Sequence, residues 1–367
     1  MKSITANITK ILYVLLATFP LMKENLNSII ILLCMVFMVF HLIATKEKPR
    51  LTKQIVLCTL VFWMYFLYQI ISFQFNTKII LLHLPFLIFP LLFNFRPKYI
   101  SDKIRSYSIS TFQISTAIQS IYFLALFLLN NSFQNIFAIS NENIPLFRDY
   151  VFRNAYFEIH PTYFSIFLLI SFTISSLFII NNGLKGKIAL IQGLNLPFVV
   201  FFIFLFSSKM VMIILSLTII ALFFILIKKF NKKIIFASSL ILILTIVMGS
   251  FLFIDIIGKR FSEITTEIDK PIVGNYHNST NIRIAIFNCS TQLIKEVSFF
   301  GYGDSLQEHL DICYAQNNSN FYKISTYNTH NYYFNLILYG GYFFLLLLNF
   351  FFLLILKKKK LIKYCFL

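Results

Sequence analysis

The sequence predicts an all-α, polytopic transmembrane bundle of about ten helices, with a large outer loop between the last two. Three observations predict this fold. Hydrophobic residues make up 58% of the 367-residue chain and charged residues only 13%, which is about half the charged fraction of a soluble domain. Apolar runs of about 20 residues, long enough to cross a bilayer, recur along the chain. Basic residues gather between alternate runs. A water-soluble enzyme is therefore excluded.

The apolar runs define ten candidate spans between charged or polar breaks. They lie at residues 5–22, 28–45, 54–73, 79–95, 107–130, 160–180, 188–206, 210–227, 234–254 and 332–356. The first run is the weakest, because Lys10 and Pro20 interrupt it. An alternative interpretation is a signal peptide, although no small-x-small cleavage site follows. Three regions are expected: nine helices within 1–254, a periplasmic loop within 255–331, and the last helix with a basic cytoplasmic tail within 332–367.

The basic residues set the predicted orientation in the membrane. If the N-terminus is cytoplasmic, the inner segments hold 21 of the 32 Lys and Arg residues but only two of the 14 acidic residues, Glu47 and Asp102. This positive-inside pattern predicts that both termini are cytoplasmic and that the large loop is external. Contact of the inner loops with anionic membrane lipids accounts for the net charge of +18. Nucleic acid is therefore not an expected partner.

Ionisable residues are scarce inside the spans: His41, His83 and, near one end, Lys10. A transporter usually places several charges at mid-membrane depth, so this scarcity argues against one. The fifth span is nevertheless polar for its depth. Hydrogen bonding between helices is the preferred explanation and a cavity lining the alternative. Its polar residues are Ser108, Ser110, Thr111, Gln113, Ser115, Thr116, Gln119 and Ser120.

The outer loop at 255–331 contains a predicted amphipathic helix at Asn281–Ser298, which would lie against the membrane or the bundle. Its apolar positions at helical spacing are Ile282, Ile286, Cys289, Leu293 and Val297. Gly301 and Gly303 are expected to end this helix as a C-cap and a tight turn. His330 follows at the junction of water and membrane, where it can reach a lipid-borne headgroup.

At these residues the chain resembles a known family. His330-Asn331, then nine residues, then Gly341 resembles the His-Asn-x9-Gly signature of the O-antigen ligase and polymerase superfamily. Arg283 followed by Gly301-Tyr302-Gly303 resembles its Arg and Gly-x-Gly pattern. Two more segments are similar to family motifs: Phe206-Ser207-Ser208-Lys209, with Lys in place of Arg, and His160-Pro161-Thr162-Tyr163. Phe344 departs from the family's usual small or polar residue, and relatives commonly continue beyond the tenth span.

The resemblance implies a metal-independent glycosyltransferase without a cofactor in the bacterial inner membrane. Its donor would be a polyprenyl-diphosphate-linked glycan. Its acceptor would be a lipid A core sugar in a ligase or another lipid-linked glycan in a polymerase, and both remain open. Such a reaction needs cations at the departing diphosphate and a base near the acceptor hydroxyl. His330 and Arg283 are the expected catalytic residues. The expected substrate-binding residues are Arg148, Arg153, Lys209, His160 and Asn331.

Several of these residues also have structural interpretations. Arg148 and Arg153 lie beside Asp149 and Glu158, so at least one of them is expected in a surface ion pair. Lys209 can anchor a helix end by reaching toward the membrane surface, and His160 can cap the sixth span.

The chain also leaves broader alternatives open. Cys289 and Cys313 share the oxidising outer side, so a disulfide between them is an open alternative. At the level of function, the rivals are a polysaccharide flippase or transporter and a membrane component whose loop docks a partner.

Overall fold

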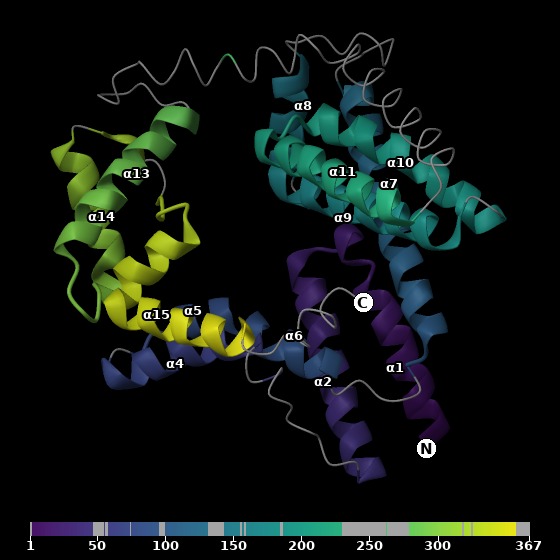
Figure 1. The fold of residues 1–367 in the computed structure, drawn as a ribbon, viewed down its shortest axis with the longest axis horizontal. Helices are drawn as coiled ribbons and strands as arrows, with labels where there is room; N and C mark the ends of the chain where they lie inside the picture. Colours follow the sequence, from purple (N-terminus) through teal and green to yellow (C-terminus); the bar gives the residue numbers. More distant parts are fainter. Residues whose placement is uncertain are drawn as a thin grey trace. The chain divides into compact units, whose positions relative to one another are not determined.

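The computed structural model describes residues 2–46, 55, 58–73, 75–94, 100–130, 143–154, 156–157, 159–183, 186–229, 262, 279–317, 319–323 and 326–356. Every regular element in these ranges is helical (Figure 1), and six of their helices are long and apolar enough to cross a membrane. The predicted span at 234–254 lies outside the described residues. The chain forms two compact units: Met1–Ala44 with Pro97–Glu263, and Thr45–Arg96 with Ile264–Leu367.

In the first unit, the long helices follow the predicted spans. They are α2 (Glu24–Thr45), α7 (Asp102–Asn130), α9 (Pro161–Asn182), α10 (Lys187–Phe206) and α11 (Lys209–Lys229). The first predicted span is divided into α1 (Lys2–Leu16) and the 3-10 helix η1 (Phe19–Leu21). Pro20 lies in η1 and has no N–H to donate, so the α-helix does not continue through it. The short helix α8 (Asn143–Phe152) lies between the fifth and sixth predicted spans and was not predicted.

Buried amides and hydroxyls join the helices α7, α9 and α10 of the first unit. Gln113 and Gln192 exchange two amide hydrogen bonds of 2.9 Å each. Ser175 donates to Gln192 at 2.6 Å, and Asn195 donates to Ser175 at 2.8 Å. The preferred explanation, hydrogen bonding between helices, therefore holds for Gln113 of the predicted fifth span. Thr116 and Ser120 instead donate to carbonyls of their own helix.

The second unit contains the third and fourth predicted spans. The third forms α4 (Leu60–Ile71). The fourth, predicted as one span at 79–95, forms α5 (Thr77–His83) and then α6 (Pro85–Asn94), joined by Leu84 with helical backbone angles. Pro85 cannot donate a backbone hydrogen bond to the preceding turn, and it takes the first position of α6, where no donor is needed.

The outer loop and the last span complete the second unit. They form α13 (Ser279–Glu296), the 3-10 helix η3 (Gly303–Ser305), α14 (Leu306–Gln316), the 3-10 helix η4 (Phe321–Lys323) and α15 (Tyr332–Leu356). The predicted apolar face of α13 is confirmed: Ile286 is 1% exposed, and Leu293 is also buried in the apolar cluster that α13 forms with α4, α14 and α15. The expected C-cap was wrong, because α13 ends at Glu296 and Val297 turns into the core before Gly301.

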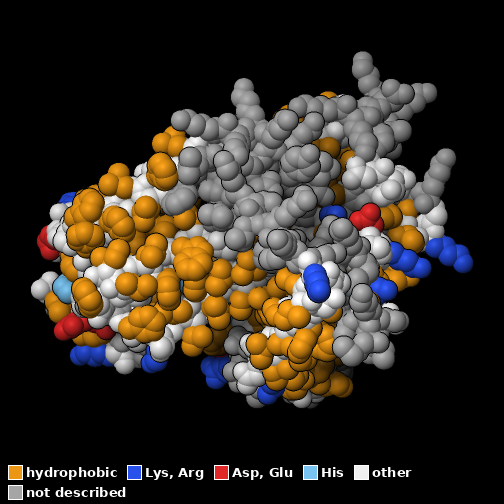
Figure 2. Space-filling model, turned by 90° about the horizontal axis from the view of Figure 1, so that it is seen from below, with side chains coloured by type: hydrophobic (Ala, Val, Ile, Leu, Met, Phe, Trp, Pro, Cys, Tyr) orange, Lys and Arg blue, Asp and Glu red, His pale blue; other side chains and the backbone are white. Residues whose placement is uncertain are grey.

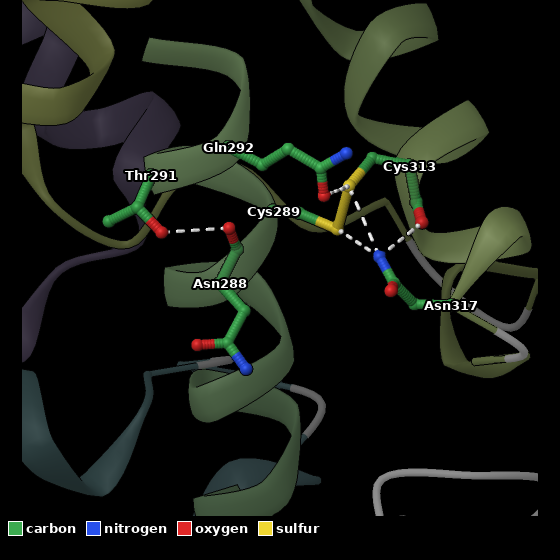
Figure 3. Close-up of a disulfide and its surroundings, with 6 residues drawn as sticks. All are labelled: Asn288, Cys289, Thr291, Gln292, Cys313 and Asn317. Carbon is green, nitrogen blue, oxygen red and sulfur yellow. Dashed lines mark hydrogen bonds between the residues drawn. A yellow bond between two sulfur atoms is a disulfide. The ribbon is translucent and has the colours of Figure 1, made fainter. Parts of the chain in front are cut away.

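A disulfide between Cys289 and Cys313 joins α13 to α14 (Figure 3). The Asn317 side-chain amide donates to the Cys313 carbonyl at 2.9 Å and lies 3.3 Å from the Cys289 sulfur. The two cysteines are 24 residues apart in the sequence, so the crosslink is expected to stabilise the loop by about 3 kcal/mol. Disulfides persist on the oxidising side of a membrane, which supports an external position for this loop.

Large apolar side chains cover much of the described surface. Figure 2 shows hydrophobic side chains over most of the described part of one face. Phe73, Leu82 and Leu129 are among those exposed. A monomeric soluble protein rarely exposes contiguous apolar patches of this kind. The surface, like the six long helices, is that of a protein that resides in a membrane.

Candidate functional site

Arg283 and His330, the two predicted catalytic residues, both lie in the second unit. Arg283 lies in the second turn of α13, and its side chain is exposed. His330 precedes α15 by two residues and is also exposed. Partial burial lowers the pKa of His330 below its ordinary value, and the positive charge of Arg283 lowers it further. The imidazole is therefore neutral at pH 7 and can accept a proton.

Local hydrogen bonds hold His330 in an unusual backbone conformation. Its φ angle is +48°, in the left-handed region that non-glycine residues seldom adopt. The His330 N–H donates to the Asn328 side-chain oxygen at 2.9 Å. The Thr329 hydroxyl donates to the Asn331 carbonyl at 2.9 Å. Strained backbone of this kind is concentrated at functional sites, where the surrounding structure holds it in place.

Asn331 caps the N-terminus of α15. Its side-chain oxygen accepts the backbone N–H of Tyr333 at 2.9 Å and that of Phe334 at 3.3 Å. These bonds satisfy two of the free donors at the helix start. The His-Asn pair therefore combines a candidate base with a helix cap. Contact of Asn331 with substrate stays a prediction.

Gly301 of the Gly-x-Gly motif and Gly341 of the His-Asn-x9-Gly motif lie in close backbone contact. Gly301 has φ +78° and Gly341 has φ +66°. A Cβ on either residue would overlap backbone atoms of the other segment: Tyr339 and Gly341 for Gly301, and Phe299 and Gly301 for Gly341. The Gly-x-Gly turn and the kink in α15 at Gly341 thus require glycine for the same close approach.

Tyr302, between the two glycines, links the turn to both neighbouring helices. Its N–H donates to the Leu338 carbonyl of α15 at 2.8 Å. Its hydroxyl donates to the Leu293 carbonyl of α13 at 3.3 Å, and its ring packs at a tilt of 35° against His309, with the ring centroids 4.3 Å apart. Burial and the negative charge of Glu296 raise the pKa of Tyr302, so the hydroxyl keeps its proton. The turn therefore connects the helix that carries Arg283 with the helix that follows His330.

A second group of candidate residues lies in the first unit. The chain turns sharply between α10 and α11 at Ser207, which has φ +42° and is buried. Lys209 begins α11 directly after this turn. Arg148 of α8 donates to the Ser207 carbonyl at 3.3 Å and to its hydroxyl at 3.4 Å. The structure thus brings Arg148 to the Ser-Ser-Lys motif, a contact that the sequence did not indicate.

The structural interpretations of Arg153 and His160 are confirmed. Arg153 forms an ion pair with Asp149 at 2.9 Å, and the two side chains are 77% and 51% exposed. The His160 Nδ1 accepts the Thr162 N–H at 3.2 Å and caps α9. Substrate contact by either residue stays a prediction. Among the described residues, no group of three or more His, Cys, Asp or Glu side chains could hold a metal ion.

One polar cluster in the second unit was missed by sequence reasoning. Gln69 of α4, Asp304 of η3 and Tyr339 of α15 are hydrogen-bonded to one another. Asp304 directly follows the Gly301-Tyr302-Gly303 motif, whereas Gln69 is 235 residues away from it in the sequence. No local pattern pairs the two positions.

Residues 194–362 match the O-antigen ligase family model. The match covers a little under half of the chain and includes Lys209, Arg283, His330 and Asn331. The resemblance drawn from the motifs is therefore confirmed over this segment. Comparisons with curated proteins and with solved structures gave no match. The family match supports a membrane glycosyltransferase of the ligase or polymerase type.

Proposed function

We propose that this protein is an O-antigen ligase-like glycosyltransferase of the bacterial inner membrane. It moves a glycan from a polyprenyl-diphosphate carrier to a sugar hydroxyl of the lipid A core at the outer leaflet, without a metal ion. Both termini lie in the cytoplasm and the large loop in the periplasm. A polymerase of the same superfamily would use the same donor chemistry with another lipid-linked glycan as acceptor.

The coupling of Arg283 to His330, inside the segment that matches the family, carries this proposal. In the transfer step, the acceptor hydroxyl oxygen bonds to the anomeric carbon of the donor sugar. The bond from that carbon to the diphosphate breaks, and its electron pair leaves with the diphosphate. Neutral His330 takes the hydroxyl proton, and the permanently charged Arg283 guanidinium neutralises the leaving group.

The electrostatic roles proposed for Arg283 and His330 are compatible. A cationic Arg283 disfavours protonation of His330, so the base stays available while the guanidinium stays charged. The start of α15 adds the positive end of a helix dipole beside His330, which also favours an anionic leaving group. Arg148, Arg153, Lys209, His160 and Asn331 remain predicted substrate-binding residues, each to be tested separately.

The test is surface-polysaccharide profiling by gel in a deletion strain. The strain is complemented with the wild type, His330→Ala, Arg283→Ala or Lys295→Ala. Lys295 is an exposed basic residue on the same helix as Arg283, so its replacement is the matched control. We expect the first two variants to lose transfer at normal membrane abundance and the control to retain it. Ile286→Ala should instead lower abundance, because it leaves a cavity in a buried cluster.

The species that accumulates on deletion identifies the reaction. Unattached polymeric glycan on the carrier indicates a ligase, and single repeat units indicate a polymerase. If His330→Ala and Arg283→Ala both restore the full ladder, the transferase proposal fails, and a transport or docking role becomes the better explanation. Loss of abundance in both variants would make the two residues structural.

A further inference from the structure

The polar cluster of Gln69, Asp304 and Tyr339 joins two buried side chains to an exposed carboxylate. The Tyr339 hydroxyl donates to an Asp304 carboxylate oxygen at 2.9 Å and accepts a hydrogen bond from the Gln69 amide. The same amide donates to that Asp304 oxygen at 3.4 Å. Gln69 is 1% exposed and Tyr339 4% exposed. The polar groups of Gln69 and Tyr339 would be costly to bury without partners, and the exposed Asp304 carboxylate supplies an acceptor to both.

Helix α4 contacts the residues on either side of the Gly301–Gly303 turn, Phe300 and Asp304, through two adjacent residues. Besides Gln69, Tyr68 donates its hydroxyl to the Phe300 carbonyl at 2.8 Å. The Gln69 oxygen in turn accepts the Asn76 N–H at the start of α5. Both the nitrogen and the oxygen of the Gln69 amide are thus hydrogen-bonded. The segment 60–71 lies outside residues 194–362, which match the family, so the motifs alone do not include this contact.

The turn held by α4 is the same element that connects the two candidate catalytic residues. Tyr302 binds Leu338 of α15 and Leu293 of α13. The Phe343 N–H also donates to the Phe299 carbonyl at 3.1 Å. Movement of the turn would therefore shift α15, which starts beside His330, relative to α13, which carries Arg283.

We propose that Gln69 and Asp304, through Tyr339, are positioning residues that fix the start of α15 and hence His330 relative to Arg283. Asp304 acts as a hydrogen-bond acceptor, and its charge takes no part in the transfer. This inference rests on the proposed function for its catalytic consequence. Its structural part, the clamping of α15 by α4 and the turn, is testable independently of transfer.

The decisive comparison is between Asp304→Ala and Asp304→Asn in the full-length protein. Each variant is purified and reconstituted into liposomes that contain carrier-linked glycan extracted from the host strain. Asparagine keeps an acceptor oxygen for Tyr339 and Gln69, and alanine does not. A misplacement of about 1 Å costs on the order of 100-fold in rate, so we expect a 10- to 100-fold lower kcat for Asp304→Ala. Asp304→Asn should lose about fivefold or less. Glu308→Ala, which removes an exposed carboxylate from the adjoining helix α14, is the control.

The tyrosine is tested in the same way. Tyr339→Phe removes the donor to Asp304 and should lower kcat about as much as Asp304→Ala. Tyr342→Phe makes the same change at an exposed position of the same helix and should leave kcat unchanged. The double variant of Asp304→Ala and Tyr339→Phe should be no worse than either single variant, because the two changes break one shared interaction.

Amide hydrogen exchange measured by mass spectrometry tests the hold of α4 and the turn on α15 independently of catalysis. Amides of residues 332–339 should exchange faster in Asp304→Ala than in the wild type, and at the wild-type rate in Asp304→Asn. If Asp304→Asn is as inactive as Asp304→Ala, the charge is required and the positioning role is overturned. Unchanged exchange in Asp304→Ala also overturns it. Full activity of His330→Ala with faster exchange in Asp304→Ala would refute the proposed function while supporting the clamp.

Discussion

Replacing Gly341 with alanine tests whether the turn and α15 are in direct backbone contact. Gly341 has φ +66° and ψ −164°, a region that is essentially restricted to glycine and costs another residue about 1–3 kcal/mol. An added Cβ would also overlap the Phe299 oxygen and the Gly301 nitrogen. Both are backbone atoms, so only separation of the turn from α15 relieves the clash. That separation breaks the Tyr302–Leu338 and Phe343–Phe299 hydrogen bonds, at about 1 kcal/mol each.

Gly183 provides the matched control for this prediction. It has nearly the same backbone angles, φ +76° and ψ −175°, but a Cβ there would meet nothing within 4 Å. Gly183→Ala therefore carries the backbone strain without the clash, and Gly341→Ala should lose about 2 kcal/mol more. Heating the detergent-solubilised variants and measuring the folded fraction by gel filtration gives the two Tm values. Equal losses in both variants would refute the backbone contact.

Three further outcomes are expected. Arg283→Gln removes a positive charge that lowers the pKa of His330, so that pKa should rise. The pH midpoint for modification of neutral His330 by diethyl pyrocarbonate should therefore move upward, and an unchanged midpoint would contradict the coupling. Replacing Cys289 and Cys313 together with serine should cost about 3 kcal/mol and lower the Tm, whereas serine at the exposed Cys58 should not; equal Tm values would count against a stabilising disulfide. Asn331→Ala should lose about 1 kcal/mol of capping energy, and Asn331→Asp should keep it. Loss of transfer in Asn331→Asp at unchanged stability would indicate substrate contact by the amide.

Apolar run length predicted most of the long helices, because crossing a bilayer demands about 20 residues without charge. The run at 188–206 forms α10 at Lys187–Phe206, and the run at 332–356 forms α15. Apolar run length does not predict where the backbone geometry of proline ends one helix and begins another. The run at 79–95 is apolar apart from His83 and Asn94, yet Pro85 begins a second helix within it. Helix α14 was missed although Leu306, Leu310 and Cys313 follow helical spacing and are buried, because its polar residues suggested a loop.

The candidate site was predicted only as far as local motifs reach. Arg283 and His330 were predicted from their motifs, and the charge of Arg283 lowers the pKa of His330. The contact of Arg148 with Ser207 and the clamp from Gln69 to Asp304 were not found. Each joins segments far apart in the chain through one or two hydrogen bonds. Such contacts depend on how helices pack, and a single sequence contains no periodic signal for them.

The two consecutive glycines of α15 have different physical roles, which explains how Phe344 is accommodated where the family usually has a smaller residue. Gly341 permits the backbone contact with the turn, whereas a Cβ on Gly340 would overlap the ring of Phe344. Phe344 is fully buried, and its ring packs edge-on against Tyr65 and Tyr68 of α4 at 5.1 and 5.2 Å. The absent side chain at position 340 thus provides the volume that position 344 fills. Helix α4 therefore holds α15 on both sides of its kink, by the hydroxyl of Tyr339 before Gly341 and by the ring of Phe344 after it.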